Sequence, residues 1–167
     1  MTGTTDTPVT LTIDGREVTV PTGTTILQAA GGRSESGIPT LCYGETITPK
    51  NACRVCMVEV EGSRTLVPSC SRPVEPDMVV RTRSERVDHA RKMVLEFLGS
   101  SVDLSLTDGV EEWNAEYGAA PGRYGADAAT VAQPVKVDND LYVATTRSAS
   151  CATSASTPAA TSGGTAS

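Results

Sequence analysis

Short alternating runs of apolar and polar residues dominate the start of the chain. Residues Val9–Ile13 alternate β-forming side chains and end at Asp14-Gly15, a dipeptide typical of the tight turn in a hairpin. After the turn, Val18 and Val20 fall on one face of an extended segment. This pattern predicts a β-hairpin at the beginning of the fold.

A short helix is predicted directly after the hairpin. Pro21-Thr22-Gly23 breaks the strand, and Thr25 with Gln28 three residues later has the spacing of a capping box. Residues Ile26–Ala30 continue the helix, and Gly31-Gly32 and Gly37 end it. The local signals therefore place one helix between the hairpin and the remaining strands.

Three more strands and a longer helix complete the predicted domain. After an extended stretch at Ile38–Cys42, strands are expected over Arg54–Val60, Thr65–Ser69 and Met78–Thr82. Ser84 then caps a helix over Glu85–Leu98, where apolar residues recur at helical spacing, and Gly99 closes it. A hairpin, a helix and returning strands in this order predict an α+β fold of the β-grasp type.

The remainder of the chain carries weaker signals. A second short helix is expected over Gly109–Tyr117, a loop over Pro121–Pro134 and an extended segment over Pro134–Val143. From Ser148 onward nothing is charged and little is bulky, which is typical of a disordered segment. The predicted parts are a flexible N-terminus (1–8), the β-grasp domain (9–83), a helix with an extended linker (84–143) and a disordered tail (144–167).

Composition and charge exclude several classes of protein. Only 4% of the residues are aromatic and the net charge is −6, with dispersed basic residues, which argues against a nucleic-acid surface. No apolar run approaches the roughly 20 residues that span a bilayer. Residues Met1–Pro8 lack the apolar core of a signal peptide. We therefore expect a cytoplasmic protein, in which disulfides are rare.

The cysteines carry the candidate chemistry. Four of the five have the spacing C-x10-C-x2-C-x13-C, at Cys42, Cys53, Cys56 and Cys70, and the fifth is Cys151. Four thiolates that converge on one centre suit an iron–sulfur cluster. A structural zinc site uses the same side chains, although such sites usually come as two C-x2-C pairs. Two disulfides and buried inert thiols are the remaining interpretations of the same spacing.

The residues around the cysteines suit a loop that wraps a cofactor. They are small and poor in charge, so that backbone N–H groups would reach the cysteine sulfurs and tune them. Asn51 is expected at positive φ, where a loop often needs glycine. For Arg54, between the paired cysteines, both a solvated position and one facing a partner or the cofactor stay open.

At this point the sequence resembles a known family. The residues that carry the resemblance are Ile38–Cys42, Ala52–Gly62, Arg64–Leu66, Val79–Thr82 and Ser84–Val87. They resemble the N-terminal [2Fe–2S] domain of the large iron–sulfur subunit of respiratory complex I, which also opens iron-only hydrogenases and the catalytic subunit of NAD-dependent molybdenum formate dehydrogenases. The resemblance covers about residues 9–98 and implies a 2Fe-2S ferredoxin-like fold. It implies one [2Fe–2S] cluster held by Cys42, Cys53, Cys56 and Cys70.

The chain departs from this family beyond the first domain. Many members continue with a second cluster site, His-x3-Cys-x2-Cys-x5-Cys, but the corresponding stretch near Ser100–Leu104 has neither Cys nor His. The sole histidine, His89, lies inside the preceding predicted helix. Val135–Val143 resembles the formate dehydrogenase branch, where this segment leads into two ferredoxin-like [4Fe–4S] motifs and molybdopterin domains.

From Ala144 onward the resemblance stops and an Ala-, Thr- and Ser-rich tail begins. A disordered low-complexity linker is one interpretation. The one we favour is a shift of reading frame, which would also make Cys151 incidental. If the true codons begin one base earlier, alanines with the spacing of a bacterial C-x2-C-x2-C-x3-C ligand run conceal cysteine codons, at Ala149, Ala152, Ala155 and Ala159.

The sequence therefore predicts an electron-transfer module, a fragment of an NAD-linked, formate dehydrogenase-like oxidoreductase. Its expected partners are a flavin/NAD subunit and further iron–sulfur domains, with no nucleic acid and no membrane span. Whether the chain is itself an enzyme stays open, because no complete active site is recognisable in it. A free-standing ferredoxin-like carrier and a structural four-cysteine zinc module are the competing functions.

Overall fold

The computed structural model describes residues 8–44, 48–102, 104, 107–124, 136–139 and 142–144. The strands are β1 (Pro8–Ile13), β2 (Arg16–Pro21), β3 (Met57–Val60), β4 (Val67–Pro68), β5 (Val79–Arg81), β6 (Lys136–Asn139) and β7 (Tyr142–Ala144). The helices are α1 (Ile26–Ala29), α2 (Gly32–Glu35), α3 (Glu85–Ser101), α4 (Val110–Tyr117) and the 3₁₀ turn η1 (Pro121–Tyr124).

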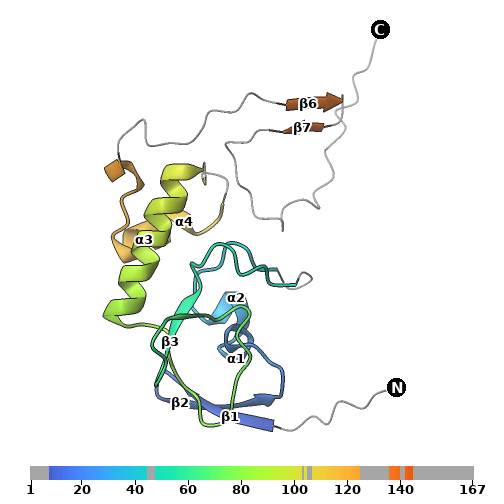
Figure 1. Cartoon of the computed structure of the whole chain (residues 1–167), viewed down its shortest axis with the longest axis vertical. Helices are drawn as coiled ribbons and strands as arrows, with labels where there is room; N and C mark the ends of the chain where they lie inside the picture. Colours follow the sequence, from blue (N-terminus) through green and yellow to red (C-terminus); the bar gives the residue numbers. More distant parts are fainter. Residues whose placement is uncertain are drawn as a thin grey trace.

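Five strands form one mixed sheet in the order β2-β1-β5-β3-β4. Figure 1 shows β1 and β2 side by side in this sheet. The first and last strands, β1 and β5, pair in parallel at its centre, and the other neighbours are antiparallel. The β1–β2 turn has positive φ at both Asp14 (47°) and Gly15 (79°), the geometry that a two-residue hairpin turn requires. The α+β, β-grasp fold predicted from the sequence is thus confirmed.

Helix α1 lies across the sheet and closes the main core. Thr25 and Gln28 form the predicted capping box, in which the Thr25 side chain accepts from the Gln28 N–H and the Gln28 side chain accepts from the Thr25 N–H. Ile26 and Leu27 are completely buried. The Leu27 N–H donates to the Ser69 carbonyl at 3.0 Å, which ties α1 to the segment that follows β4.

Several local predictions were wrong. The loop predicted from Pro121 begins with the 3₁₀ turn η1, and the strand predicted over Thr65–Ser69 is reduced to β4. Strand β3 begins at Met57 rather than Arg54, because Arg54 has φ +62°, which an extended strand does not allow. Helix α2 adds a turn at Gly32, where the sequence predicts only an end. Helix α3 runs through Gly99 instead of closing there: a Cβ at Gly99 would lie 2.6 Å from Pro121 Cγ, so glycine is needed for close packing against η1.

The second half of the chain agrees partly with expectation. Helix α4 matches the predicted helix, and β6 and β7 form a two-stranded sheet within the segment expected to be extended. Cys151 and the suspected out-of-frame tail beyond Ala144 lie outside the described residues, as do residues 1–7. Among the described helices, none has both the length and the apolar character that crossing a bilayer requires.

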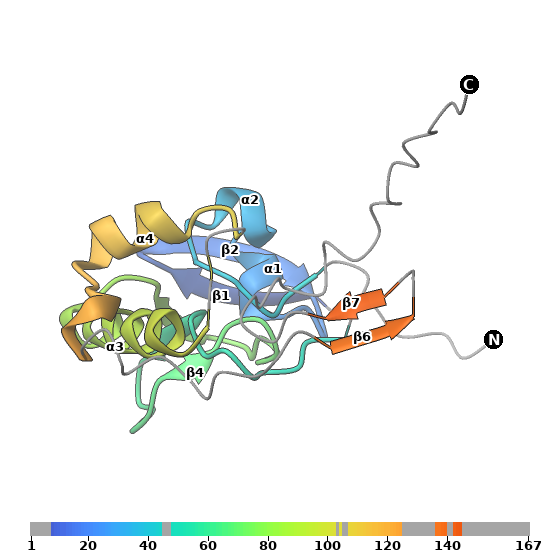
Figure 2. The ribbon, with the colours of Figure 1, turned by 90° about the horizontal axis from the view of Figure 1, so that it is seen from above.

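Helices α3 and α4 lie together at one end of the sheet, and a second core joins them to the cysteine-bearing loops (Figure 2). Its buried members are Leu41, Val55, Leu95, Val110 and Tyr117. At the start of α3, the Ser84 hydroxyl accepts from the Val87 N–H and donates to Glu59 on β3 at 2.6 Å. The helix that follows the predicted domain is thus packed on that domain.

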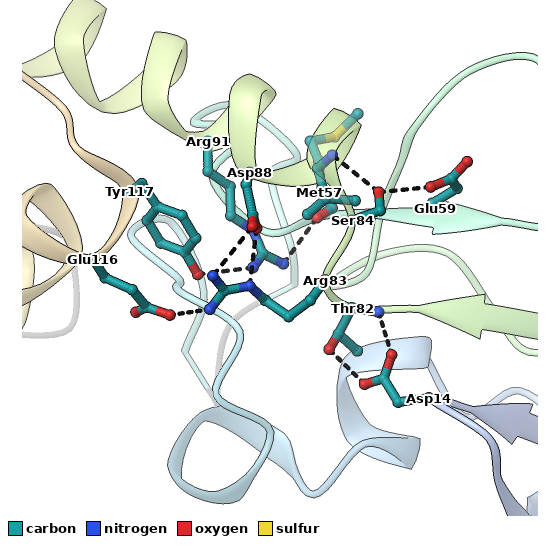
Figure 3. A network of polar contacts seen from close by, with 11 residues as sticks. Asp14, Met57, Glu59, Thr82, Arg83, Ser84, Asp88, Arg91, Glu116 and Tyr117 are labelled. Atoms are coloured by element: carbon teal, nitrogen blue, oxygen red, sulfur yellow. Dashed lines mark hydrogen bonds and ion pairs between the residues drawn. The ribbon is translucent and has the colours of Figure 1, made fainter.

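Polar contacts also hold α3 and α4 against the β-grasp domain (Figure 3). Arg91 is 1% exposed and donates to the Tyr117 hydroxyl at 2.9 Å and to the Met57 carbonyl at 3.0 Å. Arg83 forms ion pairs with Asp88 and Glu116. Because Arg91 contacts β3 and α4 from α3, one buried guanidinium holds three elements together.

A second tie links the first hairpin to the end of β5. The carboxylate of Asp14, in the β1–β2 turn, accepts from the Thr82 N–H at 2.7 Å and from the Thr82 hydroxyl at 2.6 Å (Figure 3). This clamp fixes the point where the sheet ends and α3 begins.

Replacing Tyr117 by Phe removes an acceptor from the buried Arg91 guanidinium. We expect the free energy of unfolding, measured by urea denaturation, to fall by about 1–2 kcal/mol. The matched control is Tyr124→Phe, an exposed tyrosine whose change should stay within about 0.5 kcal/mol. Equal effects of the two substitutions would contradict the proposed role of the Tyr117 hydroxyl.

Replacing Asp14 by Gly keeps the turn conformation and removes both bonds to Thr82. The free energy of unfolding should fall by about 1–3 kcal/mol. Asp77→Gly is the control, because Asp77 also has positive φ (58°) but no side-chain hydrogen bond among the described residues. That substitution should be neutral or slightly stabilising, and a loss as large as that of Asp14→Gly would refute the clamp.

Candidate metal centre

The four predicted ligand cysteines lie on three segments that meet beside the β3–β4 pair. Cys56 directly precedes β3, and Cys70 follows shortly after β4. The antiparallel register, Met57 opposite Pro68, brings these two ends together, and the Ser69 N–H donates to the Cys56 carbonyl at 3.1 Å. Cys42 and Cys53 come from the long connection between α2 and β3.

The structure groups the four thiols as two pairs. The Cys53 N–H donates to Cys42 Sγ at an N–Sγ distance of 3.5 Å, and the two thiols interact directly. Cys56 and Cys70 form the second hydrogen-bonded pair. Cys70 is also within electrostatic range of both members of the first pair, so all four thiols share one region. All four are free cysteines, which excludes two disulfides in this structure.

The arrangement of the four cysteine thiols as two pairs differs from the single tetrahedral site of a structural zinc ion. Among the described residues, no three Cys, His, Asp or Glu side chains gather closely enough to hold one metal ion. A structural zinc ion needs four ligands around one point, whereas the irons of a two-iron cluster take two protein ligands each. The observed grouping therefore fits a two-iron cluster better than zinc.

Burial and hydrogen bonding set the proton affinities of the thiols. The Cys70 thiol donates to Cys56 and lowers the pKa of Cys56 to about 6, and the same bond raises the pKa of Cys70. Burial raises the pKa of Cys53 to about 11. The buried pair thus offers one thiolate readily, and the ionised form is the one that binds metal.

Backbone N–H groups point at the sulfurs, as the sequence predicts for a loop wrapped around a cofactor. Cys53 Sγ accepts from the Val55 N–H, and Cys56 Sγ accepts from the Cys70 N–H. Asn51 has φ +59°, which confirms its predicted conformation, and Arg54 adds a second left-handed residue that the sequence did not reveal. These turns expose successive N–H groups to one centre.

Unpaired buried oxygens offer a further test of the fit. Thr40 is 2% exposed, and its hydroxyl has no hydrogen-bond partner among the described residues; the same holds for Asn51 Oδ1. Each residue precedes a cysteine of the first pair by two positions, Cys42 and Cys53 respectively. Leaving a buried polar group unpaired costs about 1–3 kcal/mol. The Thr40 hydroxyl is a donor and suits a sulfide-containing cofactor, which accepts hydrogen bonds, whereas Asn51 Oδ1 is itself an acceptor and gives no support to the fit.

Sequence reasoning missed the part that α3 plays at this site. Cys53 packs against the second core, so α3 and α4 back the first thiol pair. The only signal was the apolar spacing in α3, which does not say what the helix contacts. His89 lies exposed on that helix, away from the second core.

The comparisons with known proteins agree with this geometry. The family described as "2Fe-2S iron-sulfur cluster binding domain" matches residues 6–85. The NADP-reducing hydrogenase subunit HndD of Solidesulfovibrio fructosivorans is 53% identical over 95 residues, 54% of this chain and 16% of that protein. The mitochondrial NADH-ubiquinone oxidoreductase 78 kDa subunit of Candida albicans is 37% identical over 123 residues, 70% of this chain and 17% of that protein.

A solved structure extends the similarity to the fold. The crystal structure of an NAD+-reducing [NiFe]-hydrogenase in the H2-reduced state aligns with a TM-score of 0.56 and 25% identity, covering 67% of this chain and 50% of that chain. This chain spans less than a fifth of the length of the two relatives above. Residues 6–85 are a 2Fe-2S iron–sulfur cluster binding domain of the kind found in subunits of NAD(P)-linked oxidoreductases, and the cofactor of this chain is a [2Fe–2S] cluster.

Proposed function

We propose that Cys42 and Cys53 hold one iron of the cluster and that Cys56 and Cys70 hold the other. The observation that carries this assignment is geometric: the Cys53 N–H donates to Cys42 Sγ, and the β3–β4 register brings Cys56 and Cys70 together. The chain would then serve as a one-electron relay within a larger oxidoreductase. Its similarity to short stretches of long subunits supports this role.

The bound cluster supplies the chemistry of taking up and releasing a single electron. The residues of this chain supply its environment. Buried Cys56 and Cys70 keep water from one side, and N–H donors from Val55 and Cys70 stabilise negative charge on the sulfurs. Cys42 and Cys53 are partly exposed, so electrons would pass most directly through their side of the site.

One observation supports the second candidate, a free-standing carrier. Helix α3 packs its buried residues Val87 and Leu95 within this chain, and needs no neighbour to cover them. Burial of these two residues within the chain is what a free-standing module requires, although Phe97 on the same helix is 63% exposed. The relay stays our first proposal because the chain matches only 15–17% of several much longer subunits.

The parent enzyme is proposed to belong to the formate dehydrogenase branch, with a reading-frame shift near Ala144. The resemblance of Val135–Val143 to that branch supports the first part, and the regular spacing of alanines in the tail supports the second. The expected partners are a flavin/NAD subunit and further iron–sulfur domains.

Replacing Cys56 by Ser should abolish or strongly alter the visible absorption of the cluster and the EPR signal of its reduced form, because one buried thiolate ligand is lost. The matched control is Cys151→Ser, which should leave both spectra unchanged. Metal analysis of the unmodified chain should give iron and acid-labile sulfide in equal amounts. Zinc without sulfide, or an unaltered spectrum for Cys56→Ser, would overturn the assignment.

Sequencing the gene tests the frame shift separately. We expect that restoring one base near the codon of Ala144 opens a frame that reads RDYSKCILCYKCVDACGDQW and continues into further cluster motifs. An unbroken frame with unrelated codons would remove the hypothesis and leave the cluster assignment intact.

A further inference from the structure

Residues 48–56, the part of the α2–β3 connection that carries Cys53, are basic on an acidic protein, whereas the part that carries Cys42 includes Glu45. Residues 48–56 contain two cations, Lys50 and Arg54, and no carboxylate, whereas the whole chain has a net charge of −6. Both side chains are exposed. Arg54 follows Cys53 directly, and Cys53 is partly exposed, so the two cations lie on the loop that brings the site to the surface.

The backbone conformation of Arg54 has a structural role, but that role does not require an arginine side chain. With φ +62° it turns the chain so that the next N–H, from Val55, reaches Cys53 Sγ. Glycine would adopt this conformation without the penalty that a Cβ brings. The choice of arginine therefore points to a use for the guanidinium itself.

Within the described part of the chain, that use is not an internal one. The Arg54 and Lys50 side chains have no hydrogen bond or ion pair there; Arg72, Arg81, Arg83 and Arg123 each pair with a carboxylate, while Arg16, Arg33 and Lys92 share the unpaired state of the two loop cations. The nearby helix α4 carries exposed Glu111 and Glu112, and neither pairs with the loop cations. The two charges are thus available to another molecule.

We propose that Lys50 and Arg54 form a docking surface for a redox partner protein that presents carboxylates, and that this surface controls electron exchange at the Cys42–Cys53 side of the cluster. The inference rests on the proposed ligand set. Charge complementarity argues for an acidic partner, because local cations raise the concentration of an anionic surface at the exposed edge of the site.

Electron exchange with charged oxidants tests this surface. The reduced full-length chain passes one electron to a cobalt(III) complex, which becomes cobalt(II), with no bond formed to the protein. Stopped-flow rates are measured with the anion cobalt(III)–EDTA and the cation hexaamminecobalt(III). Arg54→Glu should slow the anionic reaction by about three- to fivefold at low ionic strength and speed the cationic one. Both effects should vanish near about 0.5 M salt, where screening is nearly complete.

Arg16→Glu is the matched control, since it changes the net charge equally on the exposed β1–β2 hairpin. It should alter both rates far less. Poly-L-glutamate should compete with the anionic oxidant for the unmodified chain and lose this effect in a Lys50→Glu, Arg54→Glu double variant. Arg54→Gln serves as a milder variant if charge reversal prevents folding.

The EPR signal and reduction potential of each variant are recorded first. If the unmodified chain shows no [2Fe–2S] signal, the proposed function fails. If the signal is intact, any difference in rate between the variants tests the docking surface alone. Equal rate changes for Arg54→Glu and Arg16→Glu, or no competition by poly-L-glutamate, would overturn the docking surface. Arg54→Gly should keep the melting temperature or raise it while slowing the anionic reaction, which a purely structural arginine would not do.

Discussion

Antiparallel pairing of β3 with β4 is the constraint on which the thiol site depends. With Met57 opposite Pro68, the chain before β3 and the chain after β4 leave the sheet at the same end. A slip of one residue would turn alternate side chains to the other face and separate Cys56 from Cys70. The buried pair is therefore a product of strand register, held by hydrogen bonds between segments that are close in the chain.

The first thiol pair depends on a different device. Cys42 and Cys53 lie in irregular backbone, where no ladder fixes their position. Left-handed residues at Asn51 and Arg54 bend the loop, and the second core behind Cys53 supports it. Packing of α3 and α4 thus holds Cys42 and Cys53 in position, as the β3–β4 pairing holds Cys56 and Cys70. If α3 and α4 lost their packing on the domain, the loop that carries Cys53 would lose its support and the metal centre would be displaced.

Much of this arrangement follows from local sequence signals. The Asp14-Gly15 turn, the Thr25–Gln28 capping box and the Ser84 cap each have a short-range physical cause, and the structure has all three. The cysteine spacing and family resemblance indicated the cofactor, and Asn51 was expected at positive φ.

What the sequence did not reveal was set by contacts between distant segments. Gly99 looked like a helix end because glycine often is one, yet here it permits close packing against Pro121. Arg54 looked like the start of a strand because its neighbours favour strands. The burial of Arg91 depends on Tyr117 and Met57, which no local pattern relates. Tertiary contacts override local propensity at such positions.

The parallel pairing of β1 with β5 has a consequence for the order of assembly. These strands come from opposite ends of the domain, and every cysteine of the site lies in the chain between them. A ribosome must therefore release the last strand before the first one gains its central neighbour. Until then the thiols belong to a long open loop, so insertion of iron and sulfide would come after synthesis of the domain, or would itself draw the loop closed.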